Sequence, residues 1–225
     1  MKIPASVLGH AAIGFLTFAL YANTLGHPFH YDDVHSIVDN PYIRELGRIP
    51  SFFVDPTTFS HNADNAMYRP LLLAGFAVNY ALGGYEVVGY HLVAIFLHWL
   101  CALLVGAIAK QMSGDAQAGL FAAALFAVHP IQSEPVNYIS SRSEIQAAFF
   151  ALLACAVYLR SGARSAPWVV AAFVAGVLSK STAIVVPALL LAYKLLVERR
   201  WPESKGLFAA LAGVAALYLF AVRSM

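Results

Sequence analysis

Charged residues are scarce in this chain: they make up only 12% of its 225 residues. A soluble domain carries roughly 25% charged residues, which help to cover the surface that it exposes to water. With 60% hydrophobic residues, the chain has too little polar surface for a globule in water. The composition therefore excludes an ordinary soluble protein and predicts an integral membrane protein in a lipid bilayer. The formal net charge of +2 indicates little, because the distribution of charge matters more than its sum. We expect the lipid bilayer as a partner and no nucleic acid.

Cysteine is also scarce, and neither cysteine belongs to a recognisable motif. Cys101 and Cys155 lie in the middle of apolar runs, with no CxxC or metal-ligand spacing. We interpret both as buried packing residues. The first apolar run lacks a small-residue cleavage site after it, so we expect it to remain as a membrane anchor.

Seven apolar runs predict an all-α fold, a polytopic membrane helix bundle that forms one transmembrane domain over residues 1–225. A spanning helix needs roughly 20 apolar residues, so the shorter runs must extend into their flanking residues. The predicted spans are Ala5–Leu25, Tyr90–Ala109, Ala116–Val128, Ile145–Leu159, Pro167–Leu178, Thr182–Val197 and Gly206–Val222.

The runs Pro167–Leu178 and Thr182–Val197 permit another interpretation, in which they form a single helix over Pro167–Val197. That helix would bury Lys180 near the bilayer centre, at a cost of several kcal/mol. It would also place the basic residues that follow on the outer side. We therefore prefer a helical hairpin with Lys180 at its outer apex.

A cytoplasmic N-terminus agrees best with the distribution of basic residues, which favour cytoplasmic loops. It leaves two outer loops, residues 26–89 and 129–144, on the non-cytoplasmic face of a bacterial inner membrane or an ER-like membrane. Leu71–Leu82 is apolar but too short to span, so we expect a juxtamembrane helix in the membrane interface. The cytoplasmic ends then carry Lys110, Arg160, Arg164, Lys194, Arg199, Arg200 and Lys205.

Short polar motifs recur along the outer loops in a definite order. They are His27-Pro28-Phe29-His30-Tyr31-Asp32-Asp33, Asp39-Asn40-Pro41-Tyr42-Ile43, Tyr68-Arg69-Pro70-Leu71, Tyr90-His91-Leu92, His129-Pro130-Ile131-Gln132-Ser133-Glu134-Pro135-Val136, Ser141-Arg142-Ser143-Glu144 and Ser179-Lys180-Ser181. In order and spacing they resemble the N-terminal half of GT-C glycosyltransferases, above all the transmembrane and TPR-repeat-containing O-mannosyltransferases and their bacterial relatives. Members of that family usually have Gly-Arg-x-Asp where this chain has Ser141-Arg142-Ser143-Glu144. They also have further spans beyond the seventh.

The resemblance implies a glycosyltransferase that moves a sugar, mannose being one candidate, from a polyprenyl-phosphate donor to a protein or glycan hydroxyl outside the cytoplasm. Such a transfer needs a carboxylate that takes the hydroxyl proton and cations that stabilise the departing phosphate. The alternative is a non-catalytic membrane fragment or partner subunit that binds the lipid-linked donor. A transporter fits poorly, because ionisable residues cluster at one surface rather than at the midplane.

Asp32 and Asp33 directly follow the first span and are the candidates for the catalytic base. Adjacent residues on an extended segment point in opposite directions, so only one of them needs to face a pocket. The motif favours the pair without choosing between them, and we prefer Asp33 by a small margin. Another interpretation is that the pair caps a short helix that begins near Val34. Glu134 is either a second, accessory acid or a solvated loop glutamate.

Three cations are candidates for binding the donor phosphate. Lys180 either binds phosphate or extends to the lipid headgroups, and Arg69 has the same two interpretations. Arg142 either binds phosphate or pairs with Glu134 or Glu144.

Two further residues, His129 and Glu144, are candidate substrate-binding residues. Ser141-x-x-Glu144 before an apolar run is also typical of a capping box. His30 and His35 lie on either side of the aspartates, which is compatible with a divalent metal, although loop histidines more often make structural hydrogen bonds.

Overall fold

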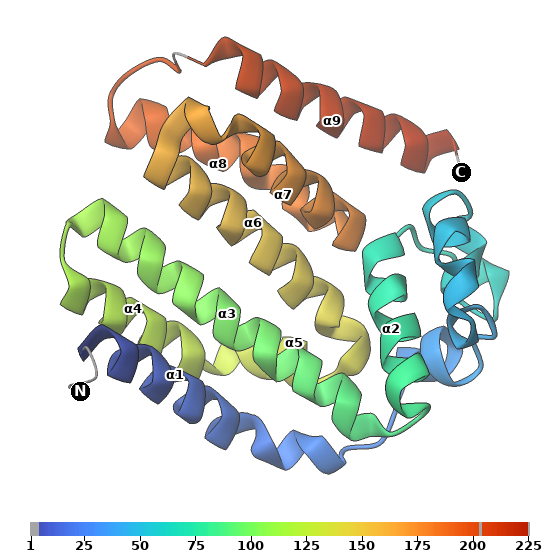
Figure 1. Ribbon diagram of the computed structural model, residues 1–225. Coiled ribbons are helices and arrows are strands. Elements are labelled where there is room, and N and C mark those ends of the chain that lie inside the picture. The colour runs from blue at the N-terminus through green and yellow to red at the C-terminus, as the bar shows by residue number, and fades with distance from the viewer. Residues whose placement is uncertain (1–4, 203, 225) are drawn as a thin grey trace.

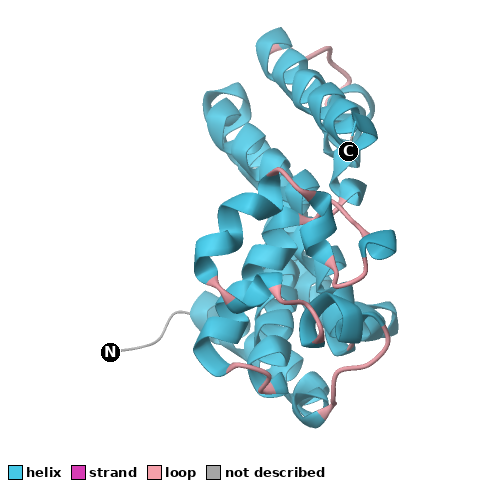
Figure 2. Ribbon diagram, turned by 90° about the vertical axis from the view of Figure 1, so that its right-hand side faces the viewer, coloured by secondary structure: helices cyan, strands magenta, loops and turns pink. Residues whose placement is uncertain are grey.

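The computed structural model describes residues 5–202 and 204–224, which are almost entirely helical (Figures 1 and 2). Short 3-10 and π-helices join and extend the main ones, and no strand occurs within these described ranges. The nine α-helices of this part of the chain are α1 Ala5–Tyr21, α2 Pro70–Gly83, α3 Val87–Ser113, α4 Ala116–Val128, α5 Ser133–Asn137, α6 Arg142–Ser161, α7 Ala166–Ser179, α8 Val186–Ala192 and α9 Lys205–Ser224.

Each predicted apolar run forms a helix, and the all-α membrane bundle is confirmed. Figure 1 shows that α1, α3, α4, α6, α7, α8 and α9 alternate in direction, so that every second connection lies at the same end. The hairpin is also confirmed, because α7 ends at Ser179 and Lys180 is extended, with φ −162° and ψ 143°. A single helix over Pro167–Val197 is therefore excluded.

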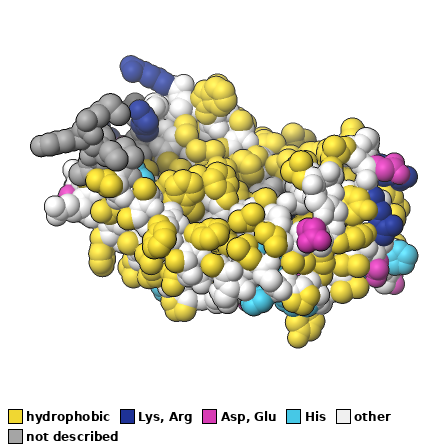
Figure 3. All heavy atoms as spheres, turned by 60° about the horizontal axis from the view of Figure 1, so that its bottom comes forward, with side chains coloured by type: hydrophobic (Ala, Val, Ile, Leu, Met, Phe, Trp, Pro, Cys, Tyr) yellow, Lys and Arg dark blue, Asp and Glu magenta, His cyan; other side chains and the backbone are white. Residues whose placement is uncertain are grey.

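Four helices, at Leu8–Gly26, Val87–Ser113, Ile139–Ser161 and Lys205–Ser224, are long and apolar enough to cross a membrane. The hydrocarbon core is roughly 30 Å thick, whereas α4, with 13 residues, is only about 20 Å long. The chain is thus a multi-pass membrane protein, and the number of seven spans stays a prediction. Figure 3 shows hydrophobic side chains over most of one face, with charged side chains mainly toward its two ends.

The outer loop before α2 folds into a compact unit with that helix. Short helices in the loop place Ile37, Ile43 and Phe52 against Phe76 of α2, and these four side chains are buried. Buried apolar area of this kind stabilises by about 25 cal/mol per Å². The unit lies across one end of the bundle (Figure 1), so the loop is held in place at the end where α5 lies.

Two glycines allow α3 and α4 to approach each other closely. A Cβ atom built on Gly106 would lie 2.8 Å from the carbonyl oxygen of Gly119, and one on Gly119 would lie 2.7 Å from that of Gly106. Helices in membranes commonly pack through small residues in this way. The contact positions α4, which leads directly into the second outer loop.

Replacement of Gly106 by alanine is expected to destabilise the protein by about 1–3 kcal/mol, because the backbones must move apart to admit the methyl group. Thermal unfolding in detergent would measure the change. Gly213→Ala is the matched control, since a Cβ atom there meets nothing within 4 Å. An unchanged unfolding temperature for Gly106→Ala would contradict the close approach.

Candidate active site

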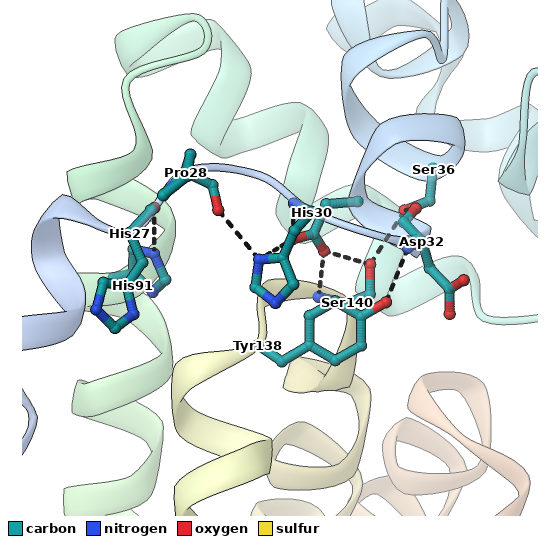
Figure 4. A network of polar contacts seen from close by, with 9 residues as sticks. His27, Pro28, His30, Asp32, Ser36, His91, Tyr138 and Ser140 are labelled. Atoms are coloured by element: carbon teal, nitrogen blue, oxygen red, sulfur yellow. Dashed lines mark hydrogen bonds and ion pairs between the residues drawn. The ribbon is translucent and has the colours of Figure 1, made fainter.

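A hydrogen-bond network around His30, Tyr138 and Ser140 joins the two outer loops (Figure 4). Asp33 binds residues of both loops in this network. Its Oδ1 accepts from the backbone N–H of Ser140 at 2.8 Å and from the Ser140 hydroxyl at 2.5 Å. Its Oδ2 accepts from the His30 N–H at 3.2 Å. The side chain is fully buried, and this burial raises the pKa of Asp33 above its ordinary value despite the hydrogen bonds. Asp33 therefore holds the loops together.

Removal of the Asp33 carboxylate by Asp33→Ala is expected to lower the free energy of unfolding by about 3 kcal/mol. The reason is that a buried donor left without an acceptor costs about 1–3 kcal/mol, and Ser140 and His30 would both lose theirs. Chemical or thermal unfolding of the detergent-solubilised protein would measure the loss.

The pH dependence provides a control for this prediction. Because the pKa of Asp33 is higher in the folded state, the folded state binds this proton more tightly than the unfolded chain. Its contribution to stability is therefore largest at acidic pH and is lost as the pH rises from about 3.9 through the raised pKa. Asp33→Asn should remove this slope, and an unchanged slope would mean that Asp33 is not its source.

Asp32 points away from this network, and 62% of its side chain is exposed. Figure 4 shows its carboxylate directed away from Ser140 and from the ring of Tyr138. Its backbone N–H donates to the Tyr138 hydroxyl at 2.9 Å, and its Oδ1 lies 3.5 Å from Nε2 of His35. These contacts fix the backbone and leave the carboxylate accessible. The motif favours the pair without choosing between them, and which aspartate acts as the base stays a prediction.

Neither helix-capping interpretation from the sequence holds. A short helix does begin at Val34, but the Asp33 side chain makes no capping hydrogen bond to it. Ser141 precedes α6, yet it has no side-chain capping bond, so the predicted capping box of Ser141 and Glu144 is wrong. The reason is that Glu144 pairs instead with Lys180.

Arg69, which directly precedes α2, faces the same end of the bundle as Asp32. Its Nη1 donates to the Ser143 hydroxyl at 3.3 Å, and its guanidinium lies 5.6 Å from the centre of the Phe59 ring. Burial lowers the pKa of Arg69, while the nearby charges of Glu144 and Asp32 raise it in part. No carboxylate lies within ion-pair distance among the described residues. Arg69 therefore has donors left for an anion.

Lys180 and Glu144 form an ion pair between the hairpin apex and the start of α6. The Lys180 side chain is 21% exposed and that of Glu144 is 42% exposed, so the pair borders solvent. Glu144 also lines a small cavity of about 170 Å³ beside Gln132 and Ile145. We call Arg69, Glu144 and Lys180 the charged cluster. Three chain segments that are distant in sequence supply it.

Arg142 does not belong to the charged cluster, although the sequence predicted that it binds phosphate or pairs with Glu134 or Glu144. It is only 1% exposed, its Nη1 donates to Oδ1 of Asn79 at 2.6 Å, and its guanidinium lies 4.4 Å from the centre of the Phe76 ring. It pairs with neither Glu134 nor Glu144, because its side chain turns inward between α2 and α6 rather than toward the outer surface. Its contacts join these two helices.

Two other predicted residues lie in the second outer loop outside the charged cluster. Glu134 is exposed, and its side chain makes no hydrogen bond or ion pair with any part of the chain that the structure describes. His129 ends α4, and its Nδ1 accepts from the Ile131 N–H at 3.2 Å. The geometry thus gives Glu134 no partner in the site and gives His129 a structural contact.

The two histidines proposed as metal ligands have other partners. Nδ1 of His30 lies 3.1 Å from the Pro28 carbonyl oxygen, and Nδ1 of His35 lies 3.0 Å from the Ser60 hydroxyl. Within the described residues, no group of three or more His, Cys, Asp or Glu side chains is arranged to hold a metal ion. The residues present do not fit the divalent metal considered from the sequence, and we derive no step through one.

Sequence reasoning missed four residues at the site. Tyr138 and Ser140 contact Asp32 and Asp33, Ser143 contacts Arg69, and the Tyr218 phenol of α9 is near enough to Arg69 to affect its pKa. Ser143 belongs to the Ser141–Glu144 motif but had no role assigned to it. No local motif marks Tyr138, Ser140 or Tyr218, since each joins the site through the tertiary fold. Burial raises the pKa of Tyr138 to about 12, so its phenol stays protonated at neutral pH.

Comparison with known proteins finds several protein O-mannosyl-transferases. The chain is 36% identical to protein O-mannosyl-transferase tmtc2 of Xenopus laevis over 153 residues, which are 67% of this chain and 18% of that relative. It is 34% identical to protein O-mannosyl-transferase Tmtc1 of Drosophila melanogaster over 155 residues, 68% of this chain and 18% of the relative. It is 30% identical to protein O-mannosyl-transferase TMTC4 of Homo sapiens over 180 residues, 71% of this chain and 24% of the relative.

The matched region spans only about a fifth of the length of these relatives. No family model matches the chain, and no solved structure matches it. Over about two thirds of its own length, this multi-pass membrane protein is a homologue of the TMTC protein O-mannosyl-transferases.

Proposed function

We propose that the protein transfers a mannosyl residue from a polyprenyl-phosphate donor to a hydroxyl group of a polypeptide. The observation that carries this proposal is that the exposed Asp32 carboxylate lies near enough to Arg69 to act on its pKa, while Glu144 acts on Arg69 and pairs with Lys180. The homologues are named protein O-mannosyl-transferases, which supports mannose as the sugar and protein as the acceptor.

Asp32 is the proposed general base. The acceptor hydroxyl attacks the anomeric carbon, its proton passes to the Asp32 carboxylate, and the bond from that carbon to the phosphate oxygen breaks. A carboxylate that serves in this way must be ionised and within hydrogen-bond reach of the hydroxyl. Asp32 is accessible, whereas both oxygens of Asp33 are already engaged in the buried network.

Arg69 and Lys180 are the proposed stabilisers of the leaving phosphate, whose negative charge grows as the sugar departs. A guanidinium suits this task because its planar array of donors matches phosphate oxygens. Lys180 is neutralised by Glu144 without substrate. Phosphate binding would therefore draw Lys180 toward the donor and release Glu144 toward the acceptor side.

The active face is proposed to lie outside the cytoplasm, with the N-terminus inside. Figure 1 supports this arrangement, because the outer loops gather at one end and the segments around Lys110 and Arg160 lie at the other. Short loops rich in lysine and arginine stay on the cytoplasmic side of membranes. A polyprenyl-phosphate donor is itself anchored in the bilayer, so its head group would meet this outer face.

The direct test is an assay of the purified protein in lipid nanodiscs with polyprenyl-phosphate mannose and a synthetic serine-containing peptide. We expect mass spectrometry to detect one added hexose on the peptide. Nucleotide-linked mannose, the control donor, should give no product. Donor that binds without transfer would overturn the enzymatic proposal and favour a donor-binding partner subunit.

A further inference from the structure

Three aromatic rings lie beside Asp32 and have no part in the proposed chemistry. We call His30, Tyr31 and Tyr138 the aromatic patch. The rings of His30 and Tyr138 lie 4.9 Å apart between centres with an interplanar angle of 31°, and Tyr31 packs edge-on against both, at 5.4 and 6.5 Å. Each ring thus has at least one aromatic neighbour, and the patch has a defined shape.

Tyr31 is the most exposed member of the patch, since 83% of it is accessible. A large aromatic side chain that is exposed to solvent beside a candidate base can contact a ligand. Neighbours on both sides fix its position, because Asp33 N–H donates to the His30 carbonyl at 3.1 Å and Val34 N–H donates to that of Tyr31 at 3.2 Å. The ring is presented by a firmly held turn.

The backbone of Tyr31 is also unusual, with φ +49°, and it is one of two non-glycine residues with positive φ in the described chain. This left-handed region is unfavourable for a bulky L-residue, whereas glycine and asparagine adopt it with less strain. Strained residues of this kind concentrate at functional sites. The backbone of this turn favours glycine or asparagine, so we infer that the tyrosine is present for the contacts of its ring.

Asp32 lies between the aromatic patch and the charged cluster in the network of contacts. Tyr138 contacts the Asp32 backbone, and the Asp32 charge acts on Arg69. Among the described residues, no hydrogen bond, ion pair or ring contact joins a member of the patch to Arg69, Glu144 or Lys180. If the phosphate occupies the charged cluster, the remaining side of Asp32 is the aromatic one.

We propose that the aromatic patch binds the polypeptide acceptor next to its reacting hydroxyl, with Tyr31 as the main contact. This inference rests on the proposed function. In a displacement at the anomeric carbon the nucleophile approaches opposite the leaving group, so the acceptor must enter from the side away from the phosphate. Aromatic faces bind peptides through apolar side chains and proline rings and prefer edge-to-face contacts.

The test is peptide binding, measured without turnover. A fluorescein-labelled Phe-Pro-Thr-Pro peptide is titrated with the protein in nanodiscs, and fluorescence polarisation gives the Kd. Tyr31→Asn removes the ring but keeps a residue that tolerates the left-handed backbone, and Tyr31→Phe keeps the ring. We expect Tyr31→Asn to raise the Kd about 3- to 10-fold and Tyr31→Phe to leave it within about twofold.

Three results would overturn the inference: an unchanged Kd for Tyr31→Asn, an equal loss for Tyr31→Phe, or a weakened binding of polyprenyl-phosphate mannose with unchanged peptide binding. The third would assign the ring to the donor sugar. The proposed function fails separately, if no hexose is transferred at all while Tyr31→Asn still weakens peptide binding. In that case the patch remains a peptide site.

Discussion

Replacement of Asp32 by asparagine is expected to reduce mannosyl transfer by about 10²- to 10⁴-fold, the usual contribution of a positioned general base. Asparagine keeps the shape of the side chain and the backbone contact to Tyr138, but it cannot take the proton of the acceptor hydroxyl. The loss should appear in kcat rather than in the Kd of the donor. A radiolabelled transfer assay at saturating donor and acceptor would measure it.

Asp64→Asn is the matched control for this substitution, because Asp64 is an exposed carboxylate of the same outer loop with no ion pair in the described chain. Transfer by this variant should match the wild type. Wild-type turnover in Asp32→Asn would reject Asp32 as the base. If the Asp33→Asn variant then lost activity while it stayed folded, the original preference for Asp33 would be restored.

Replacement of Arg69 by methionine is expected to slow transfer by about 10²- to 10³-fold, the typical effect of removing one donor to a developing anion. Methionine retains much of the apolar contact with Phe59 while it removes the charge. Arg69→Lys should recover only part of the rate, because an ammonium group lacks the planar set of donors. Steady-state kinetics with the lipid donor would show the loss.

Arg48→Met supplies the control for Arg69. Arg48 is an exposed arginine of the same loop that pairs with Glu45, so its loss should leave transfer unchanged. Equal losses in both variants would point to a general effect of positive charge on donor capture. A wild-type rate of transfer by Arg69→Met would instead show that Arg69 does not stabilise the leaving phosphate.

Much of the helical architecture was predictable from the apolar runs. The sequence predicts a helix over residues 116–128, and the structure has a helix with the same limits. The hairpin with Lys180 at its apex followed from the cost of burying that lysine. The reason is that a bilayer requires the backbone of a spanning segment to satisfy its own hydrogen bonds, which makes a long apolar run a direct sign of a helix.

The site was only partly predictable, and Arg142 illustrates why. Its motif, between Ser141 and Glu144, resembled a capped helix start that presents a cation to the surface. The side chain instead turns inward to Asn79 and Phe76, which lie on a different helix. Local sequence carries no information about which neighbour is within reach, so the part played by an arginine near a helix end depends on packing.

The sequence by itself determined that this chain is a helical membrane protein and that its polar chemistry lies on one face, because composition and apolar periodicity respond directly to the solvent around the chain. Only the tertiary structure shows that Asp33 is fully buried while 62% of the Asp32 side chain is exposed, although the two residues are adjacent in the sequence. That difference depends on Ser140, more than a hundred residues away, whose N–H and hydroxyl donate to the Asp33 carboxylate.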